Sequence, residues 1–174
     1  MHHILIPTDF SGTAQNAVDY AISFYRGERC VFHFLNTYTP DFVHSRVMAL
    51  AHGGNQQEDS MQAASEKGLQ RLIEDLVDRD PDSGHEFHSV SSFNLLPEEV
   101  KEQVSLHPID MIVSGTTGAS GIKEVFLGSN TVRILRAASD CPVLVIPRTA
   151  GFRRGLKIGL VTDFGTPYSA SQIE

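Results

Sequence analysis

The 174-residue chain alternates between short apolar runs and longer stretches whose apolar residues recur at helical spacing. Short runs rich in branched and aromatic side chains, bounded by proline, glycine or polar residues, predict strands. The third run is the most polar, which favours a place near a sheet edge. The five runs lie at residues 2–8, 30–38, 86–93, 109–115 and 142–147.

The stretches between these runs carry apolar residues at helical spacing. The first follows Ser11, a good N-cap residue, and we expect Gly27 to end it. A longer helix is predicted around residues 69–77, a short helix opens at Pro97, and a fourth covers residues 131–138. The apolar positions of the first two helices are Ala14, Ala17, Val18, Ala21, Ile22, Leu69, Leu72, Ile73, Leu76 and Val77.

Strands and helices therefore alternate from the start of the chain to the fifth strand. Such alternation predicts an α/β fold in which an open, five-stranded parallel sheet carries helices on both faces. Ligands of such sheets bind at the carboxyl ends of the strands, where the strand order reverses. Two segments at such ends are therefore candidates: "PTDFSG" at residues 7–12 and "SGTTGASGIKEVFLGSN" at residues 114–130.

Composition narrows the class of protein. The net charge is −7, whereas nucleic-acid surfaces are usually basic, so no nucleic-acid partner is expected. No apolar run approaches the roughly 20 residues of a membrane span, and the first residues lack the basic region of a signal peptide. Two cysteines, Cys30 and Cys141, are too few for a disulfide framework and are expected to be buried thiols. The expectation is a cytoplasmic protein with no membrane attachment.

The end of the chain resembles its beginning. The segment "KIGLVTDFGTPYS" at residues 157–169 matches "HILIPTDFSGTAQ" at residues 3–15, and "TDF" follows an apolar run in both. We therefore predict a domain over residues 1–148, a linker over residues 149–156, and the first strand of a second copy of the domain over residues 157–174.

The glycine-rich segment has a composition suited to an anion. Glycines at a strand end let backbone N–H groups approach a phosphate, because no Cβ intervenes. Neither the Walker phosphate loop nor the G-x-G-x-x-G dinucleotide fingerprint is present. The spacing that is present is G-x2-G-x9-G followed by Ser, at Gly115, Gly118, Gly128 and Ser129. A plain turn and a glycine at the start of a helix remain the alternative interpretation of these glycines.

With this motif the sequence resembles the ATP-binding branch of the universal stress protein family. The resemblance covers residues 1–148 and includes "ILIPTDFS" near the start, the glycine motif, and "CPVLVIP" at the closing strand. It implies a Rossmann-like sheet of the adenine nucleotide alpha hydrolase type, with strand order 3-2-1-4-5 and a nucleotide between strands 1 and 4. It also favours a tandem member, because paired copies are common in that family.

The same resemblance implies which residues would hold ATP; whether Mg²⁺ accompanies it stays open. Asp9 would bond the ribose or adenine region, and the backbone near Leu35 and Asn36 would contact adenine. Pro7 and Thr8 would line the base pocket. The phosphates would be held by Gly115, Gly118, Gly128, Ser129 and Asn130.

Two positions depart from the family pattern. Ala119 stands where nucleotide binders often carry Arg, so a charge-assisted contact of about 1.5–3 kcal/mol is missing there. Many relatives have an apolar residue where this chain has Asn130 and Thr131. Thr131 could bond a phosphate, Asn130 could serve only the helix start, and Lys123 is the nearest cation. We therefore expect weaker binding than in relatives that carry the Arg.

The expected function is an ATP-binding stress-response or regulatory module in which bound nucleotide alters assembly or partner binding. The alternative is a dimerisation or chaperone-like module of the same fold that binds no nucleotide. An enzyme is not expected, because no nucleophile–base pair or paired carboxylate stands out, although weak ATP hydrolysis stays open. The resemblance also implies a homodimer or a domain pair formed through the fifth strand, whose apolar edge invites pairing.

Histidines are numerous but show no metal-ligand spacing. His85 and His88 are three residues apart on a predicted strand, so their side chains should point to opposite faces of the sheet. Both are expected to be solvated.

Overall fold

A computed structural model describes residues 1–39, 55–81, 83–116, 128–138, 141–155, 157 and 159, with side chains of helix α3 described from residue 58. Strands and helices alternate along the chain as predicted. They are β1 (His2–Pro7), α1 (Gly12–Phe24), β2 (Cys30–Thr37), α3 (Asn55–Arg79), β3 (Glu86–Ser92), α4 (Leu96–Leu106), β4 (Met111–Gly115), α5 (Ser129–Ala137) and β5 (Val143–Ile146).

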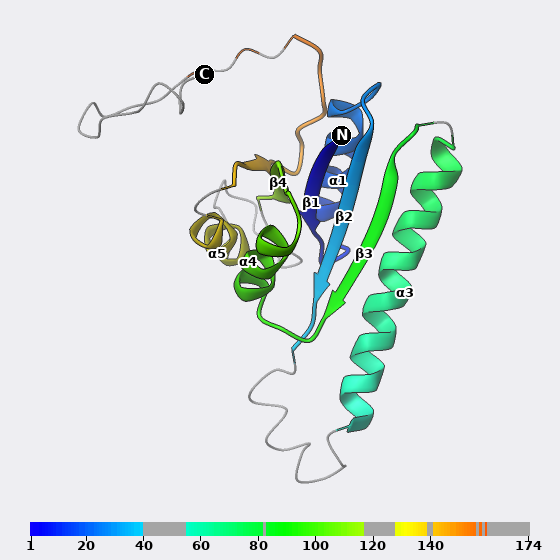
Figure 1. The fold of residues 1–174 in the computed structure, drawn as a ribbon, viewed down its shortest axis with the longest axis vertical. Helices are drawn as coiled ribbons and strands as arrows, with labels where there is room; N and C mark the ends of the chain where they lie inside the picture. The colour runs from blue at the N-terminus through cyan, green and yellow to red at the C-terminus, as the bar shows by residue number, and fades with distance from the viewer. Residues whose placement is uncertain are drawn as a thin grey trace, which may run out of the picture.

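The five strands form one parallel sheet in the order β3-β2-β1-β4-β5, which confirms the predicted topology (Figure 1). β1 is central, and β3 lies at an edge, as its polar character predicts. The chain continues outward on one side of β1 and then returns to its other side as β4. The strand order therefore reverses between β1 and β4, and their carboxyl ends flank the position where such folds bind ligands.

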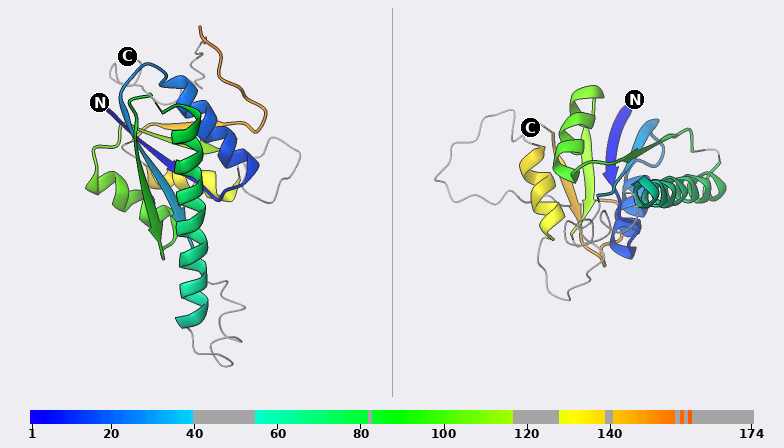
Figure 2. Two further views of the ribbon diagram at one scale, coloured as in Figure 1. Left: turned by 90° about the vertical axis from the view of Figure 1, so that its right-hand side faces the viewer. Right: turned by 90° about the horizontal axis from the view of Figure 1, so that it is seen from below.

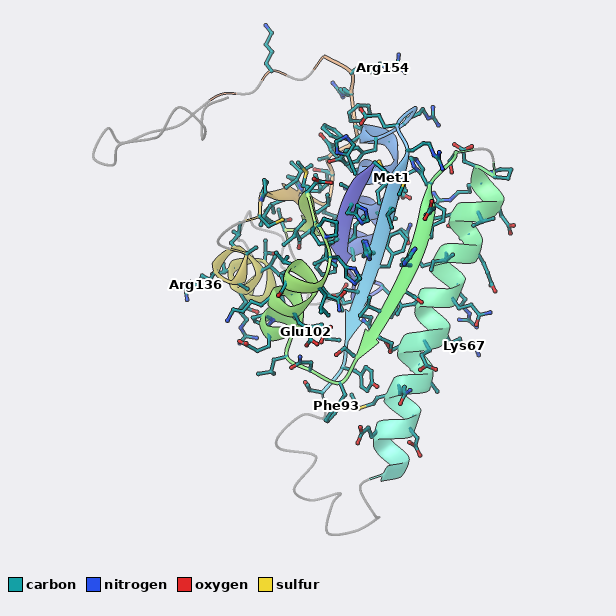
Figure 3. The ribbon with its side chains drawn as sticks, viewed as in Figure 1. Met1, Lys67, Phe93, Glu102, Arg136 and Arg154 are labelled. Carbon is teal, nitrogen blue, oxygen red and sulfur yellow. The ribbon has the colours of Figure 1, made fainter. Side chains whose placement is uncertain are left out.

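Helices cover both faces of the sheet, with α1 and α3 on one side and α4 and α5 on the other (Figure 2). Alternate side chains of β1 pack into the hydrophobic cores on the two faces of the sheet. Ile4 and Ile6 pack with α1 and α3, whereas Leu5 packs with α4 and α5. All three are 0% exposed. The side chains that fill these two cores fix the positions of the helices relative to the strand ends (Figure 3).

Helix α1 begins as predicted but ends earlier. The hydroxyl oxygen of Ser11 accepts a hydrogen bond from the backbone N–H of Ala14 at 3.3 Å, so Ser11 is the N-cap. The helix ends at Phe24, ahead of the predicted end at Gly27, and Gly27 adopts a φ of +92° in the turn that follows. In α3 the predicted apolar face is narrower than expected, because Val77 is exposed.

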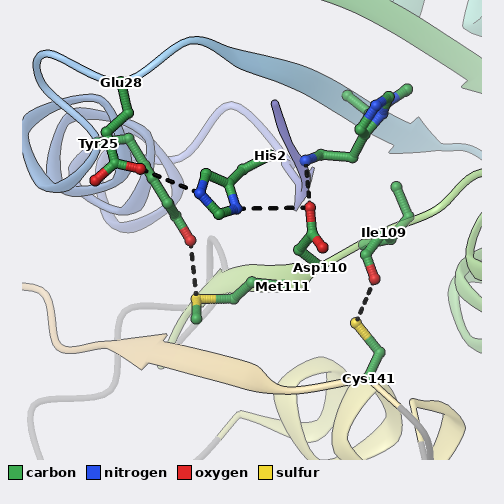
Figure 4. Close-up of polar contacts among 9 residues, drawn as sticks. His2, Tyr25, Glu28, Ile109, Asp110, Met111 and Cys141 are labelled. Carbon is green, nitrogen blue, oxygen red and sulfur yellow. Dashed lines mark hydrogen bonds and ion pairs between the residues drawn. The ribbon is translucent and has the colours of Figure 1, made fainter.

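Polar contacts join the amino ends of the central strands (Figure 4). His2 lies 3.2 Å from Glu28 and 3.8 Å from Asp110, and the Asp110 carboxylate accepts a hydrogen bond from the backbone N–H of His3 at 2.8 Å.

Both cysteines are buried, as predicted, and the Cys141 thiol lies 3.6 Å from the Ile109 carbonyl oxygen. Burial raises the pKa of both thiols, which favours their neutral form.

The segment after β5 folds back onto α1. The ring of Phe152 packs edge-on against Tyr20 and Phe24, at centroid distances of 5.6 and 5.8 Å. The side-chain amide of Asn16 donates to the carbonyl oxygens of Pro147 and Ala150, both at 3.0 Å. The predicted linker is thus tied to the domain in its first half. Residues 158 and 160–174 lie outside the described residues, so the second domain copy stays a prediction.

Candidate functional site

A cavity of about 530 Å³ lies where β1 and β4 end, at the position predicted from the strand order. Its volume falls within the roughly 300–1,000 Å³ range of small-molecule sites. Strand ends, the loop between β3 and α4, and one side of α5 all contribute to it. The described lining consists of Pro7, Thr8, Asp9, Ala14, Asn36, Thr37, Thr39, Asn94, Leu95, Leu96, Pro97, Ser114, Gly115, Asn130, Thr131, Arg133 and Ile134.

Six of the ten predicted site residues line this cavity. These residues come from three strand ends and one helix start: Pro7, Thr8, Asp9, Asn36, Gly115 and Asn130. Because the carboxyl ends of parallel strands meet at one edge of a sheet, residues far apart in the sequence converge there. Strand order and the family resemblance, taken together, therefore predicted one wall of the cavity.

Four predicted residues are not in the described lining. The side chain of Leu35 is 0% exposed, and its carbonyl oxygen accepts a hydrogen bond from the backbone N–H of Thr8 at 2.8 Å. Its backbone belongs to β2, a strand that is paired on both sides, so this carbonyl oxygen takes part in the hydrogen bonding of the sheet. Gly128 and Ser129 stand at the start of α5, outside the described lining, and Gly118 lies outside the described residues.

The loop after β1 holds Asp9 at the cavity through short hydrogen bonds. The Asp9 carboxylate accepts the backbone N–H of Ser11 at 3.0 Å, and the Thr8 hydroxyl accepts that of Phe10 at 3.0 Å. The Asn36 amide donates to the Thr8 carbonyl oxygen at 2.7 Å, which ties this loop to the end of β2. Phe10 itself has a φ of 60°, a left-handed conformation that is costly for a bulky residue.

Helix α3 makes room for that strained residue. A Cβ added at Gly68 would lie 2.5 Å from the ring of Phe10, so only glycine fits beneath the ring as it stands. Contacts from α1, β2 and α3 therefore fix the loop that presents Asp9. Such preorganisation is typical of a binding loop.

Gly115 has a packing role in addition to its place in the cavity wall. A Cβ at this position would lie 2.8 Å from Cγ2 of Thr13 and 3.0 Å from its carbonyl oxygen. Glycine therefore permits the close approach of β4 and α1. The hydroxyl of Thr131 donates to the Gly115 carbonyl oxygen at 2.8 Å, and Thr131 is only 3% exposed. The possibility that Thr131 donates to a phosphate is therefore not supported, because its one hydroxyl proton is used on the backbone.

The start of α5 places polar groups near the same cavity. Gly128 is the N-cap, its N–H donates to the Thr116 carbonyl oxygen at 2.6 Å, and no described side chain caps the helix. Ser129 and Asn130 are exposed in the first turn, which carries no acidic residue. The positive end of the helix dipole is thus close to a cavity that Asn130 lines.

A buried carboxylate supports the opposite wall. Glu99 of α4 is 4% exposed and accepts hydrogen bonds from Ser92 at 2.6 Å, Gln103 at 2.8 Å and Asn94 at 3.1 Å. Burial raises the pKa of Glu99, but the hydrogen bonds from Ser92, Gln103 and Asn94 outweigh it, so the pKa lies below its usual range. The ionised side chain fixes the loop from Asn94 to Pro97 that lines the cavity. Sequence reasoning missed this wall, because no local motif marks it.

The charges in the described lining are one carboxylate, Asp9, and one guanidinium, Arg133. Arg133 was not foreseen from the sequence. In the part of the chain that the structure describes, no group of three or more His, Cys, Asp or Glu side chains is arranged to hold a metal ion. No described helix has the length and apolar character needed to cross a membrane.

Histidines away from the cavity differ from expectation in one respect. His85 and His88 do face opposite sides of the sheet, since His85 contacts Phe32 and His88 lies beside His33. The expectation that both are solvated is wrong for His85, which is half-buried edge-on to Phe32 at 5.0 Å. Burial lowers the pKa of His85 below its ordinary value.

Comparison with known proteins places this chain in a family. The model of the universal stress protein family matches residues 1–147. Universal stress protein MJ0577 of Methanocaldococcus jannaschii is 24% identical, covering 83% of this chain and 94% of that protein. Universal stress protein MJ0531 of the same organism is 28% identical, covering 83% and 81%.

Solved structures agree in fold. The structure of MJ0577 has a TM-score of 0.70 at 22% identity and covers 86% of this chain and 98% of its own. A universal stress protein in complex with cAMP has a TM-score of 0.54 at 19% identity, covering 83% and 96%. A family protein from Arabidopsis thaliana with AMP bound has a TM-score of 0.50 at 13% identity, covering 86% and 94%. From the family match over residues 1–147, together with the shared sheet, we conclude that this chain belongs to the universal stress protein family.

Proposed function

We propose that the cavity at the ends of β1 and β4 binds an adenine nucleotide, ATP in particular. The observation that carries this proposal is the cavity itself, which has the volume of a small-molecule site and lies where the strand order reverses. We propose further that the chain is a regulatory module, in which bound nucleotide alters assembly or partner binding.

The chemistry of the lining suits the parts of such a ligand. A carboxylate such as Asp9 accepts hydrogen bonds from ribose hydroxyls. Apolar side chains at Pro7, Leu96 and Ile134 suit the faces of a purine ring. The first turn of α5 and the guanidinium of Arg133 suit phosphate groups.

Two fold relatives are known with adenine nucleotides, one in complex with cAMP and one with AMP bound. They support adenine as the base. Their low identity to this chain leaves the number of phosphates as our proposal.

Hydrolysis is not part of the proposal. Hydrolysis needs a group that activates water and groups that stabilise the leaving phosphate. Among the described lining residues, the acid–base side chain is Asp9, and the proposal assigns it to the ribose hydroxyls. We therefore favour binding over turnover.

Isothermal titration of the full chain with ATP, in Mg²⁺ and again in EDTA, tests the proposal. Asp9→Asn keeps an oxygen for the Ser11 N–H but removes the charge, so ATP affinity should fall about tenfold or more, as expected when a charged hydrogen bond is lost. Asp78→Asn, an exposed carboxylate on α3 away from the cavity, is the matched control and should bind like the native chain. Absence of ATP binding by the native chain would overturn the proposal and favour the nucleotide-free module.

A further inference from the structure

Arg133 is a cation placed at the cavity by helix α5. It is the fifth residue of that helix, and it lines the cavity together with Asn130, one turn earlier. Its side chain is exposed and forms no hydrogen bond or ion pair with any residue that the structure describes. The guanidinium is therefore available to a ligand.

The direction of the helix brings this charge toward the cavity. Side chains on an α-helix lean toward its amino end, so the long Arg133 side chain extends back over the first turn of α5. That first turn presents backbone N–H groups and carries no acidic residue. The guanidinium of Arg133 and the start of α5 thus contribute positive potential to the same part of the cavity, in a chain of net charge −7.

The neighbouring cations are placed differently. A shallower depression of about 220 Å³ between α4 and α5 is lined by Lys101, Arg133 and Arg136 together with Pro97 and Ala137. Lys101 forms an ion pair with Glu98 at 3.3 Å, and Arg136 points outward from α5 (Figure 3). Of these three cations, only Arg133 belongs to both hollows.

We propose that Arg133 is the phosphate-binding cation of this protein, taking over the charge that Ala119 does not supply in the glycine segment. This inference rests on the proposed nucleotide function and adds to it a specificity residue on α5. Guanidinium binds phosphate through paired, charge-assisted hydrogen bonds, whereas adenosine offers no such partner. Arg133 therefore determines the preference for nucleotides over nucleosides.

Titration of ATP and adenosine into native chain, Arg133→Gln, Arg133→Lys and the matched control Arg136→Gln tests this. We expect Arg133→Gln to weaken ATP binding about tenfold or more and to leave adenosine binding unchanged. Arg133→Lys should retain part of the ATP affinity, and Arg136→Gln should bind ATP like the native chain. Thermal unfolding should be unchanged in all three variants, because both arginines are exposed.

The outcomes separate this inference from the proposed function. If the native chain binds ATP and Arg133→Gln binds it equally well, Arg133 is not the phosphate ligand, although the nucleotide site stands. An equal loss of adenosine and ATP affinity in Arg133→Gln would also overturn the inference, because the defect would not concern phosphate. If the native chain binds neither ligand, the proposed function fails and the inference fails with it.

Discussion

Acid should destabilise this protein through one buried histidine, His33 of β2. Its side chain is 3% exposed and lies among three other imidazoles. The Nε2 atom of His33 lies 3.2 Å from Nδ1 of His3, and its ring centroid lies 4.8 Å from that of His107 and 5.3 Å from that of His88. Burial, and then repulsion from His107, His88 and His3 when protonated, lowers the pKa of His33 from 6.5 to about 4.

The sign and size of the effect follow from linkage. Because the pKa of His33 is lower in the folded chain, the unfolded chain binds the proton more tightly, and acid favours unfolding. The stabilisation is complete above about pH 6.5 and is lost as the pH falls from 6.5 toward 4. The gap between the two pKa values corresponds to about 3 kcal/mol of unfolding free energy, of which about 2 kcal/mol is lost by pH 5.

Urea unfolding followed by circular dichroism at several pH values between 7.5 and 5 measures this loss. The His33→Gln variant keeps a polar side chain that does not titrate, so its unfolding free energy should fall about 2 kcal/mol less than that of the native chain over this range. His107→Gln removes the nearest ring and should recover a smaller part. Equal losses in the native chain and in His33→Gln would refute the reasoning.

Two further substitutions test packing around the site. Gly115→Ala should destabilise the chain by about 1–3 kcal/mol in urea unfolding, because the new Cβ would lie 2.8 Å from Thr13. Gly12→Ala is the control and should not be destabilised, because nothing lies within 4 Å of its Cβ. An undiminished stability of Gly115→Ala would show that β4 and α1 can separate at low cost. Phe152→Ala should lower the unfolding free energy by about 1–2 kcal/mol, since two edge-on aromatic contacts to α1 are lost; unchanged stability would mean that the segment after β5 does not support the domain.

The alternation of strands and helices, and the residues at which two helices begin, could be predicted from the sequence. Short apolar runs predicted the strands and helical spacing of apolar residues predicted the helices. Ser11 marked the start of α1, and Pro97 marked the start of α4. The rule that parallel strands end at one edge of a sheet singled out the segment that carries Asp9, and the family resemblance added Asn36; both line the cavity. These features depend on local pattern and on a general rule of sheet order.

The sequence did not predict features that depend on how helices are rotated and how strands pair in the folded chain. Arg133 faces the cavity only because of the rotation of α5 about its axis, and no local motif marks that rotation. His3 and His33 come together because parallel pairing places β1 beside β2, although 30 residues separate them in the chain. The backbone contact predicted near Leu35 stays a prediction; the structure adds that the Leu35 side chain is buried and that its carbonyl oxygen accepts the Thr8 N–H.

The central claim is that a nucleotide binds at the carboxyl ends of β1 and β4. An amide-resolved NMR titration of the full, isotope-labelled chain with ATP tests it most directly. The largest shifts are predicted at the backbone amides of Thr8, Asp9, Asn36, Gly115 and Asn130, which line the cavity. An ATP titration that leaves these amides unmoved, or that shifts residues on another face instead, would contradict the claim.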